Sequence, residues 1–334
     1  MNKTKTDVVI SFDIEFDINN AFTPPYQHKP RGKESIYCVN DNRDIGLGYI
    51  LDTLNKYDLK ATFFVETCNT SYFGSSSMGD VAQDIFKQGH DVQLHIHPAW
   101  EIFQKNDWHD FVAQHSPSSD SHDNLGQLDQ TMQTQLIKKG LSLFSEWQLP
   151  RPIALRAGNL FSSSITYQAM RENDLPIASN IGMGIHVPKE EKLHLYSGIH
   201  KFDDILEVPV TSFCDVVFLG CVHKKLATLI GMSFAEMKQL LHKCHDKAVS
   251  PAVFLSHVSE FIQPDSQYES GSKSNQTVCQ RFERLCQFLS DNRDTYNTTT
   301  ISSAYETWKS LPINGKNELI STSILLALMR GLSS

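Results

Sequence analysis

Apolar and polar positions follow two patterns that alternate along the chain. Short runs rich in β-branched and aromatic residues are typical of buried strands, and the longer segments between them repeat apolar residues at helical spacing. The predicted strands cover residues 7–15, 60–66, 90–97, 152–157, 176–181, 205–211, 251–257 and 297–302. The predicted helices cover roughly residues 41–57, 78–88, 125–147, 162–173, 231–248, 273–291, 303–310 and 315–331. Repeated strand–helix units indicate parallel strands, and seven or eight units favour a (β/α) barrel over an open sheet.

No internal repeat and no low-complexity linker divides the sequence. We therefore predict a single α/β domain, with the barrel over residues 1–312 and a C-terminal helix over residues 313–334 that packs on the barrel. A dimer contact through that helix is the alternative. Long segments that follow predicted strands, at 18–40, 98–124 and 182–204, are the loops in which such barrels carry their active sites.

The first predicted strand ends in acidic residues at alternate positions, Asp13, Glu15 and Asp17. Alternate side chains of a strand share a face, so Asp13 and Glu15 point away from the apolar side formed by Val8 and its alternate neighbours. Carboxylates together on a buried face repel one another unless a cation or a basic partner lies between them. We therefore expect a partner opposite this strand, with Asp17 as a loop acid or a supporting group.

The third predicted strand carries two histidines, His95 and His97, on one face near its end, and Pro98 follows them. Two imidazoles with a carboxylate from a neighbouring strand form a facial metal site with open positions, which suits zinc or another divalent first-row metal. The alternative is a pair of hydrogen-bonded interior histidines. The acidic first strand favours the metal site.

Two further strand ends carry polar side chains. Arg156 ends the strand over 152–157, where a bidentate pair with a carboxylate is one role and an ordinary ion pair at the barrel mouth is another. His257 ends the strand over 251–257 and is a candidate general acid, although a lone histidine there is more often a hydrogen-bonded core residue.

The bulk composition excludes several classes of protein. The 334 residues carry a net charge of −8, which argues against a nucleic-acid partner, because binding phosphates requires a basic surface. Seven scattered cysteines without a Cys-x-x-Cys pair indicate a reducing compartment rather than disulfides or thiolate zinc sites. No apolar run reaches the length of a membrane span, and strand-like sequence begins too early for a signal peptide. We therefore expect a cytoplasmic protein.

Taken together, the four strand ends resemble the NodB-like polysaccharide deacetylases of carbohydrate esterase family 4. Ser11 to Glu15 resembles the family's acidic strand end, and the histidine pair, Arg156 to Gly158 and Leu255 to His257 resemble its later motifs in the same order. The chain departs from the pattern twice, with Asp-Ile-Glu in place of an adjacent Asp pair and His-x-His in place of His-x-x-x-His. These departures are typical of a divergent branch.

The resemblance implies a distorted (β/α) barrel and a role for each motif residue. Asp13 would be the general base, Arg156 would orient it, and His257 would protonate the leaving amine. A divalent metal, most consistent with zinc, would be bound by Glu15, His95 and His97. The predicted substrate contacts, which come from the loops beside these motifs, are Trp100, Gly158 and Asn159.

The resulting prediction is a metal-dependent deacetylase that acts on an N-acetylated sugar or glycan precursor. One alternative is an amidohydrolase that acts on another small or cyclic amide. The other is a catalytically degenerate protein that binds carbohydrate or serves in an assembly. The sequence does not define the oligomeric state.

Overall fold

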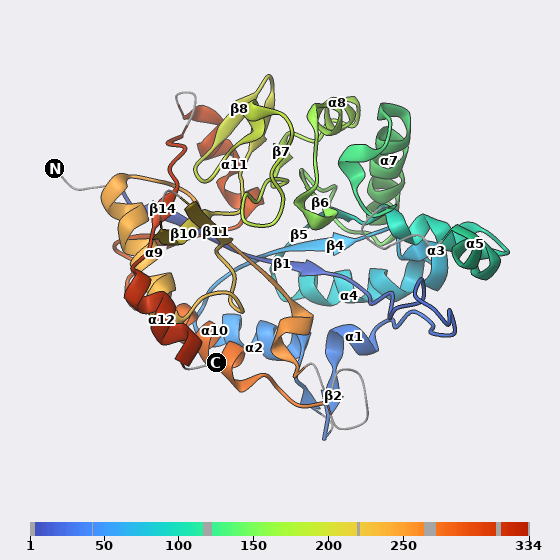
Figure 1. Ribbon diagram of the computed structural model, residues 1–334, viewed down its shortest axis with the longest axis horizontal. Helices are drawn as coiled ribbons and strands as arrows, with labels where there is room; N and C mark the ends of the chain where they lie inside the picture. The colour runs from blue at the N-terminus through green and yellow to red at the C-terminus, as the bar shows by residue number, and fades with distance from the viewer. Residues whose placement is uncertain are drawn as a thin grey trace.

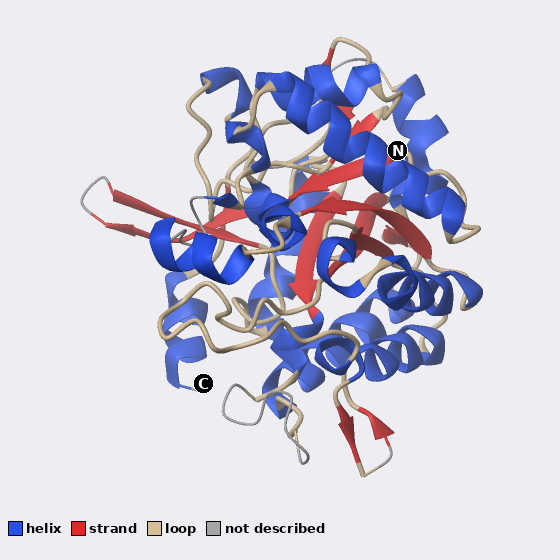
Figure 2. Cartoon of the chain, turned by 90° about the vertical axis from the view of Figure 1, so that its right-hand side faces the viewer, coloured by secondary structure: helices blue, strands red, loops and turns tan. Residues whose placement is uncertain are grey.

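The computed structural model describes residues 4–41, 43–115, 122–218, 221–263, 272–311 and 315–332. Strands lie at the centre and helices surround them, as both views show (Figures 1 and 2). The main sheet has the strand order β12 (Ala252–His257), β1 (Thr6–Ile14), β4 (Thr62–Glu66), β5 (Asp91–Ile96), β6 (Ala154–Ala157), β7 (Ile177–Ala178), β9 (Ile205–Glu207) and β8 (His200–Phe202). Strand β13 (Tyr296–Thr298) pairs with the start of β1.

Neighbouring strands of this sheet pair in parallel, except for the antiparallel pair β8 and β9. The curled sheet is joined across its gap by an irregular segment rather than by a regular strand. The backbone N–H of Val208 donates to Ala178 in β7, and three residues later the N–H of Thr211 donates to Val253 in β12. The predicted distorted (β/α) barrel is therefore confirmed.

Helices cover the outside of the sheet (Figure 1). They are α1 (Glu34–Tyr37), α2 (Leu47–Lys56), α3 (Thr70–Phe73), α4 (Ser75–Lys87), α5 (Trp108–His115), α7 (Gln130–Glu146), α8 (Ser164–Glu172), α9 (Phe234–Lys247), α10 (Gln276–Asp291), α11 (Ile301–Ser310) and α12 (Ile324–Leu332). Short 3₁₀ turns lie at η1 (Pro98–Gln104), η2 (Leu125–Gln127), η3 (Gly158–Leu160), η4 (Glu191–Leu193) and η5 (Val258–Phe261). The sequence marks some of these ends clearly, because Ser233 and Glu236 form a capping box at the start of α9.

The two faces of β1 belong to two different cores. Val8, Ile10 and Phe12 pack in the large cluster that includes the surrounding helices. Val9 packs with residues of the other strands in a smaller cluster, to which α11 also contributes Ile301 and Trp308. The Trp308 indole donates to Asp7 near the start of β1, at 2.8 Å. Helix α11 therefore packs at the amino ends of the strands and leaves their carboxyl ends available for a site.

Two predicted elements are shorter in the structure than the sequence pattern indicates. The strand predicted over 297–302 ends at Thr298, and Thr300 instead caps α11 by accepting from the N–H of Ser303. The helix predicted over 315–331 begins only at Ile324. Before it, β14 (Ile320–Ser321) pairs with the hairpin described next.

A β-hairpin that the sequence pattern does not predict projects from the barrel (Figure 2). It consists of β10 (Ser212–Phe218) and β11 (Cys221–Leu226), and β14 extends it to a three-stranded sheet. A smaller hairpin pairs β2 (Val39–Asn40) with β3 (Arg43–Asp44), where the start of a helix is predicted. Within the described residues, no helix has both the length and the hydropathy needed to cross a membrane.

Candidate active site

The register of the sheet places the carboxyl ends of β1, β5, β6 and β12 at the same end of the barrel. Asp13 at the end of β1 lies opposite His257 in β12, and His95 in β5 lies opposite Arg156 in β6. Strand β4 lies between β1 and β5, so the acids and the histidines face each other across it. Parallel strands place their carboxyl ends at the same edge, and this is why residues so distant in sequence meet.

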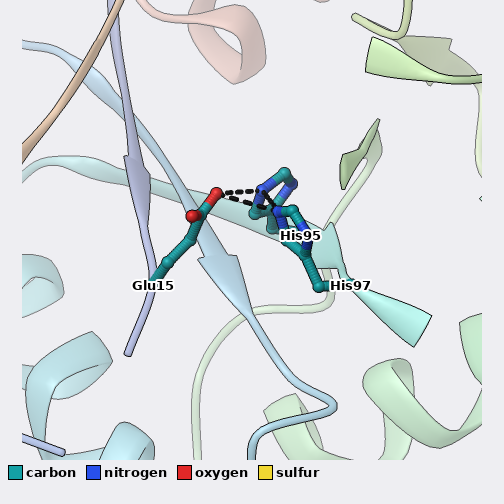
Figure 3. Close-up of side chains that lie close together, drawn as sticks. All are labelled: Glu15, His95 and His97. Carbon is teal, nitrogen blue, oxygen red and sulfur yellow. Dashed lines mark hydrogen bonds and ion pairs between the residues drawn. The ribbon is translucent and has the colours of Figure 1, made fainter. Parts of the chain in front are cut away.

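Glu15, His95 and His97 converge on one point (Figure 3). The Glu15 Oε1 atom lies 2.7 Å from His95 Nε2 and 3.0 Å from His97 Nε2, and the two Nε2 atoms are 3.1 Å apart. A tetrahedral zinc ion with bonds of about 2.0–2.1 Å holds its ligand atoms about 3.3 Å apart. The three atoms therefore need to separate by only a few tenths of an ångström to bind such an ion.

Hydrogen bonds on the far side of each imidazole fix which nitrogen faces the cluster. His95 Nδ1 donates to the carbonyl of Arg156 at 2.8 Å, and His97 Nδ1 donates to Asp123 at 2.5 Å. A carbonyl and a carboxylate only accept, so both Nδ1 atoms carry hydrogen. In the neutral imidazoles, both Nε2 lone pairs then point at the Glu15 carboxylate. Three facing acceptors require a cation, and the donor set fits a divalent metal.

The pKa shifts of these groups indicate the same need for positive charge. Burial alone lowers the pKa of His97, but Asp123 and Glu15 outweigh burial and hold that pKa well above its ordinary value. Burial raises the pKa of Glu15, yet the two histidines hold it well below its ordinary value. A proton on His97 thus occupies the position in which a metal ion would carry the positive charge.

Arg156 holds Asp13 at the centre of the site. Its Nη1 donates to Asp13 Oδ1 at 2.6 Å, while its Nη2 donates to the hydroxyls of Ser11 and Ser179, each at 3.0 Å. The pair is therefore not bidentate, in contrast to one role that the sequence allowed. Both side chains are buried, and the second oxygen of Asp13 faces His95 at 3.8 Å and His257 at 3.9 Å.

His257 is held at the edge of the cavity by Glu260, which follows it in the 3₁₀ turn η5. The His257 Nδ1 atom and Glu260 Oε1 are 3.1 Å apart, and Nε2 points toward Asp13 and Glu15. Burial lowers the pKa of His257, but the hydrogen bond to Glu260 and the charges of Glu15 and Asp13 raise it to about 9. His257 is therefore protonated at neutral pH and can donate from Nε2.

These residues open into a cavity of about 310 Å³. Asp17 and Asn159 line it, and Asp17 accepts from the N–H of Asn19 at 2.6 Å, as suits the predicted loop acid. Trp100 also lines the cavity but is only 2% exposed, and its ring packs against Phe73 and Phe103. Most of the Trp100 ring therefore anchors the turn η1 instead of presenting a face for stacking.

Gly158 has a steric role next to the histidine pair. A Cβ atom at this position would lie 2.6 Å from the His97 ring, so only glycine lets the start of η3 approach His97 so closely. The next residue, Asn159, adopts a left-handed backbone conformation with φ of 55° and extends its amide to within 3.3 Å of Asp123. Gly158 thus shapes the side of the cavity formed by His97, whereas Asn159 remains a candidate substrate contact.

Three acids that the sequence analysis did not select support the site from behind. Asp123 binds His97, Asn159 and the N–H of Ala99, and Glu260 binds His257. Glu66, at the end of β4, accepts from the backbone N–H groups of Cys68, Asn69 and His97. Burial raises the pKa of Glu66 to about 7. The only local signal was for Glu260, which lies three residues after His257 in the same motif.

With this geometry established, the sequence matches the model of one protein family, described as polysaccharide deacetylase, over residues 28–178. Over this segment, which is less than half of its length, the chain is similar to the polysaccharide deacetylase family. The matched residues include His95, His97, Asp123 and Arg156, but not β1 or β12, in or directly after which Asp13, Glu15 and His257 lie. No curated protein has a significantly similar sequence.

One solved structure supports the barrel fold. A crystal structure from Mycobacterium smegmatis, described as that of a polysaccharide deacetylase, superposes with a TM-score of 0.55 at 13% identity, over 95% of this chain and 94% of that chain. A family 4 carbohydrate esterase from Streptomyces lividans in complex with acetate has a TM-score of 0.44 at 12% identity, over 92% and 98% of the two chains. At these identities only the first likeness supports the fold, and neither defines the substrate.

Proposed function

We propose that this protein is a metal-dependent hydrolase that removes the acetyl group from the nitrogen of an N-acetylated sugar or glycan precursor. One observation carries the proposal: Glu15, His95 and His97 direct three acceptor atoms at one point, and Asp13 and His257 face that same point. The match to the polysaccharide deacetylase family supports the choice of substrate class.

Glu15, His95 and His97 would hold the metal ion in this proposal. Their donor set of two imidazoles and one carboxylate suits zinc and leaves positions open for other ligands. When bound, such an ion lowers the pKa of water, polarises the amide carbonyl and stabilises the negative charge that develops on its oxygen.

Asp13 would act as the general base. Arg156 holds one of its oxygens, so the second oxygen is oriented toward the centre of the site, where it takes a proton from the attacking water. The oxygen of that water forms a bond to the acetyl carbon. The bond from this carbon to the sugar nitrogen then breaks, and acetate is released.

His257 would act as the general acid on the sugar nitrogen. An amine leaves readily only when its nitrogen gains a proton, and the raised pKa of His257 keeps a proton on its ring at neutral pH. Because Nε2 faces both Asp13 and Glu15, the acid and the base act on the same enclosed volume. The histidine therefore completes a pair of acid and base around the metal site.

The proposal is tested by acetate release from an N-acetylated glucosamine oligosaccharide with metal-replete protein. Asp13→Asn keeps the shape of the side chain and an acceptor for Arg156, yet removes the base. We expect it to lower kcat by about 10²–10⁴-fold without loss of bound metal.

The matched control is Asp17→Asn, which neutralises another carboxylate of the same cavity that contacts none of the proposed catalytic groups. It should retain most of the activity. Full activity in the Asp13 variant would contradict the assignment of the base. A wild-type protein that binds the oligosaccharide but contains no metal and releases no acetate would favour the non-catalytic alternative.

A further inference from the structure

A second cavity, of about 370 Å³, lies where the end of β11, the start of α10 and the helix α12 meet. Three of its lining side chains are cationic: Lys225, Arg281 and Arg330. Asn275 and Thr277, at the start of α10, also line it. Among the described residues that form its wall there is no carboxylate, so the surface that a ligand would meet carries only positive and neutral groups.

Buried acids hold one of these cations in place from behind. Arg330 donates to Asp215 at 2.9 Å and to Glu236 at 2.5 Å, and the side chains of both acids are at most 1% exposed. Asp215 also binds His223, whose side chain is exposed. Because its partners cannot rotate away, the Arg330 guanidinium is fixed before any ligand arrives.

The other two cations are oriented mainly by backbone carbonyls, which do not neutralise them. Lys225 Nζ lies 2.5 Å from the carbonyl of Gly231 but 3.9 Å from Asp215. Arg281 Nη1 donates to the carbonyls of Ile230 at 2.9 Å and Leu229 at 3.3 Å. Among the described residues, these three cations contact two carboxylates, both buried, so positive groups outnumber negative ones in this part of the structure.

The electrostatics of the cluster are consistent with that excess. Burial lowers the pKa of Lys225, and the charge of Arg330 lowers it further. Burial lowers the pKa of Arg281 as well; the charge of Glu236 opposes this shift and that of Arg330 adds to it. Each lowered pKa means that the positive form is disfavoured where it lies, and a bound anion would relieve this cost.

The start of α10 adds to the positive potential of the same cavity. Helix α10 is 16 residues long, and its N-cap Asn275 accepts from the N–H of Val278. Thr277 lies in the first turn and brings a hydroxyl to the wall. The N-terminal end of a helix favours an anion, and here it supports the cationic side chains without being the basis of the site.

We infer that this cavity is a binding site for a phosphoryl group. The donors come from three elements, namely Lys225 on β11 of the hairpin, Arg330 on α12, and Arg281 with Thr277 on α10. Planar guanidinium groups with an ammonium and a hydroxyl match the several acceptor oxygens of a phosphate better than the two oxygens of a carboxylate. The ligand is either free phosphate or a phosphoryl group carried by an organic molecule, and the inference does not depend on the proposed deacetylase activity.

The test is a calorimetric titration of the full chain with inorganic phosphate. The ionic strength is kept constant, with chloride as the compensating anion. We expect saturable binding to the wild type. Arg281→Gln should weaken it at least tenfold, as the loss of a hydrogen bond to a charged group implies. Lys225→Gln is the second variant, in case the first fails to fold.

Arg284→Gln is the matched control, because it makes the same change one turn along α10, where Arg284 stacks on Phe234 outside the cavity. It should bind phosphate clearly more tightly than the Arg281 variant does, because Arg284 does not line the cavity and offers no hydrogen bond to a ligand there. N-acetylglucosamine 1-phosphate distinguishes the two sources: tighter binding than inorganic phosphate indicates a carried phosphoryl group, and equal or weaker binding indicates the free anion.

The inference is overturned if neither phosphate nor the sugar phosphate binds the wild type saturably. Equal weakening in the Arg281 and Arg284 variants would overturn it as well, because it would reduce the effect to net charge. Acetate release is measured in parallel. If Arg281→Gln folds and loses phosphate binding but still releases acetate, the two sites act independently. Failure of the phosphate inference can then be distinguished from failure of the proposed function.

Discussion

The two charged clusters of this molecule have opposite imbalances of charge. At the strand ends, the acids Asp13, Glu15 and Asp123 face the imidazoles of His95 and His97, a protonated His257 and a single arginine, so carboxylates outnumber the charged donors. Between the hairpin and α12, three cations contact two buried carboxylates among the described residues, so cations outnumber carboxylates there. The first balance requires a cation and the second an anion, in a chain whose overall net charge is −8. Local imbalance, rather than net charge, indicates what each cluster binds.

The clusters also differ in how tightly the fold determines them. The strand-end cluster depends on the parallel register of β1, β5, β6 and β12, which the whole barrel supports. The second cluster joins α9, α10 and α12 to a hairpin that projects from the barrel. We therefore expect changes in the first cluster to affect the whole molecule and changes in the second to act locally.

The largest difference should appear when each cluster loses the arginine that pairs with its buried acids, Arg156 in the first and Arg330 in the second. Arg156→Met leaves Asp13 buried without its cation, and we expect a loss of about 3–5 kcal/mol in the free energy of unfolding. Arg330→Met should cost only about 1–2 kcal/mol, because Asp215 keeps His223 and Glu236 keeps Ser233. Urea unfolding of both variants measures this. Similar losses would remove the contrast between a barrel-wide and a local cluster.

A second prediction concerns Asp123, which holds His97 from behind. Asp123→Ala removes the acceptor of His97 Nδ1, so the ring is free to change its tautomer and orientation. We expect the affinity for zinc to fall by about 10–100-fold, measured by competition with a chelator. Asp17→Ala, an acid of the same cavity that does not contact either histidine, is the control. If both variants bind zinc as the wild type does, Asp123 does not position the ligand.

The smallest effect is a shift in pH dependence from Glu260→Gln. Glu260 raises the pKa of His257, which reaches about 9, and a general acid must be protonated to work. Activity is therefore lost as the pH rises through the pKa of His257. Removing the Glu260 charge lowers that pKa, so the alkaline limb of the kcat profile should move to lower pH while the acidic limb stays in place. An unchanged alkaline limb would assign it to another group.

The sequence predicts the strand-end cluster well because two simple rules suffice. Alternation along the strand selects which face Asp13 and His95 occupy, and parallel pairing brings the carboxyl ends together. Both faces of β1 lie as the pattern predicts, with Val8 in the outer core and Asp13 toward the site. The family motifs point to the same positions.

The same rules do not predict the residues whose position depends on loops or on long-range contacts. Asp123 follows a long segment without periodicity, and only the folded chain places it next to His97. Asp215 lies in a hairpin whose partner, Arg330, is 115 residues further along the chain, so no local pattern marks that strand. Thr300 ends a β-branched run that favours a strand, but its hydroxyl is used to cap α11. In each case a long-range contact or a cap overrides local propensity.

The central claim is that Glu15, and not Asp13, completes the metal site with the two histidines. It is tested most directly by elemental analysis of purified protein after equilibration with zinc and dialysis, comparing the wild type with Glu15→Gln and Asp13→Asn. We predict close to one zinc ion per chain in the wild type and in Asp13→Asn, and a large loss of zinc in Glu15→Gln. Zinc retained by Glu15→Gln but lost from Asp13→Asn would contradict the account.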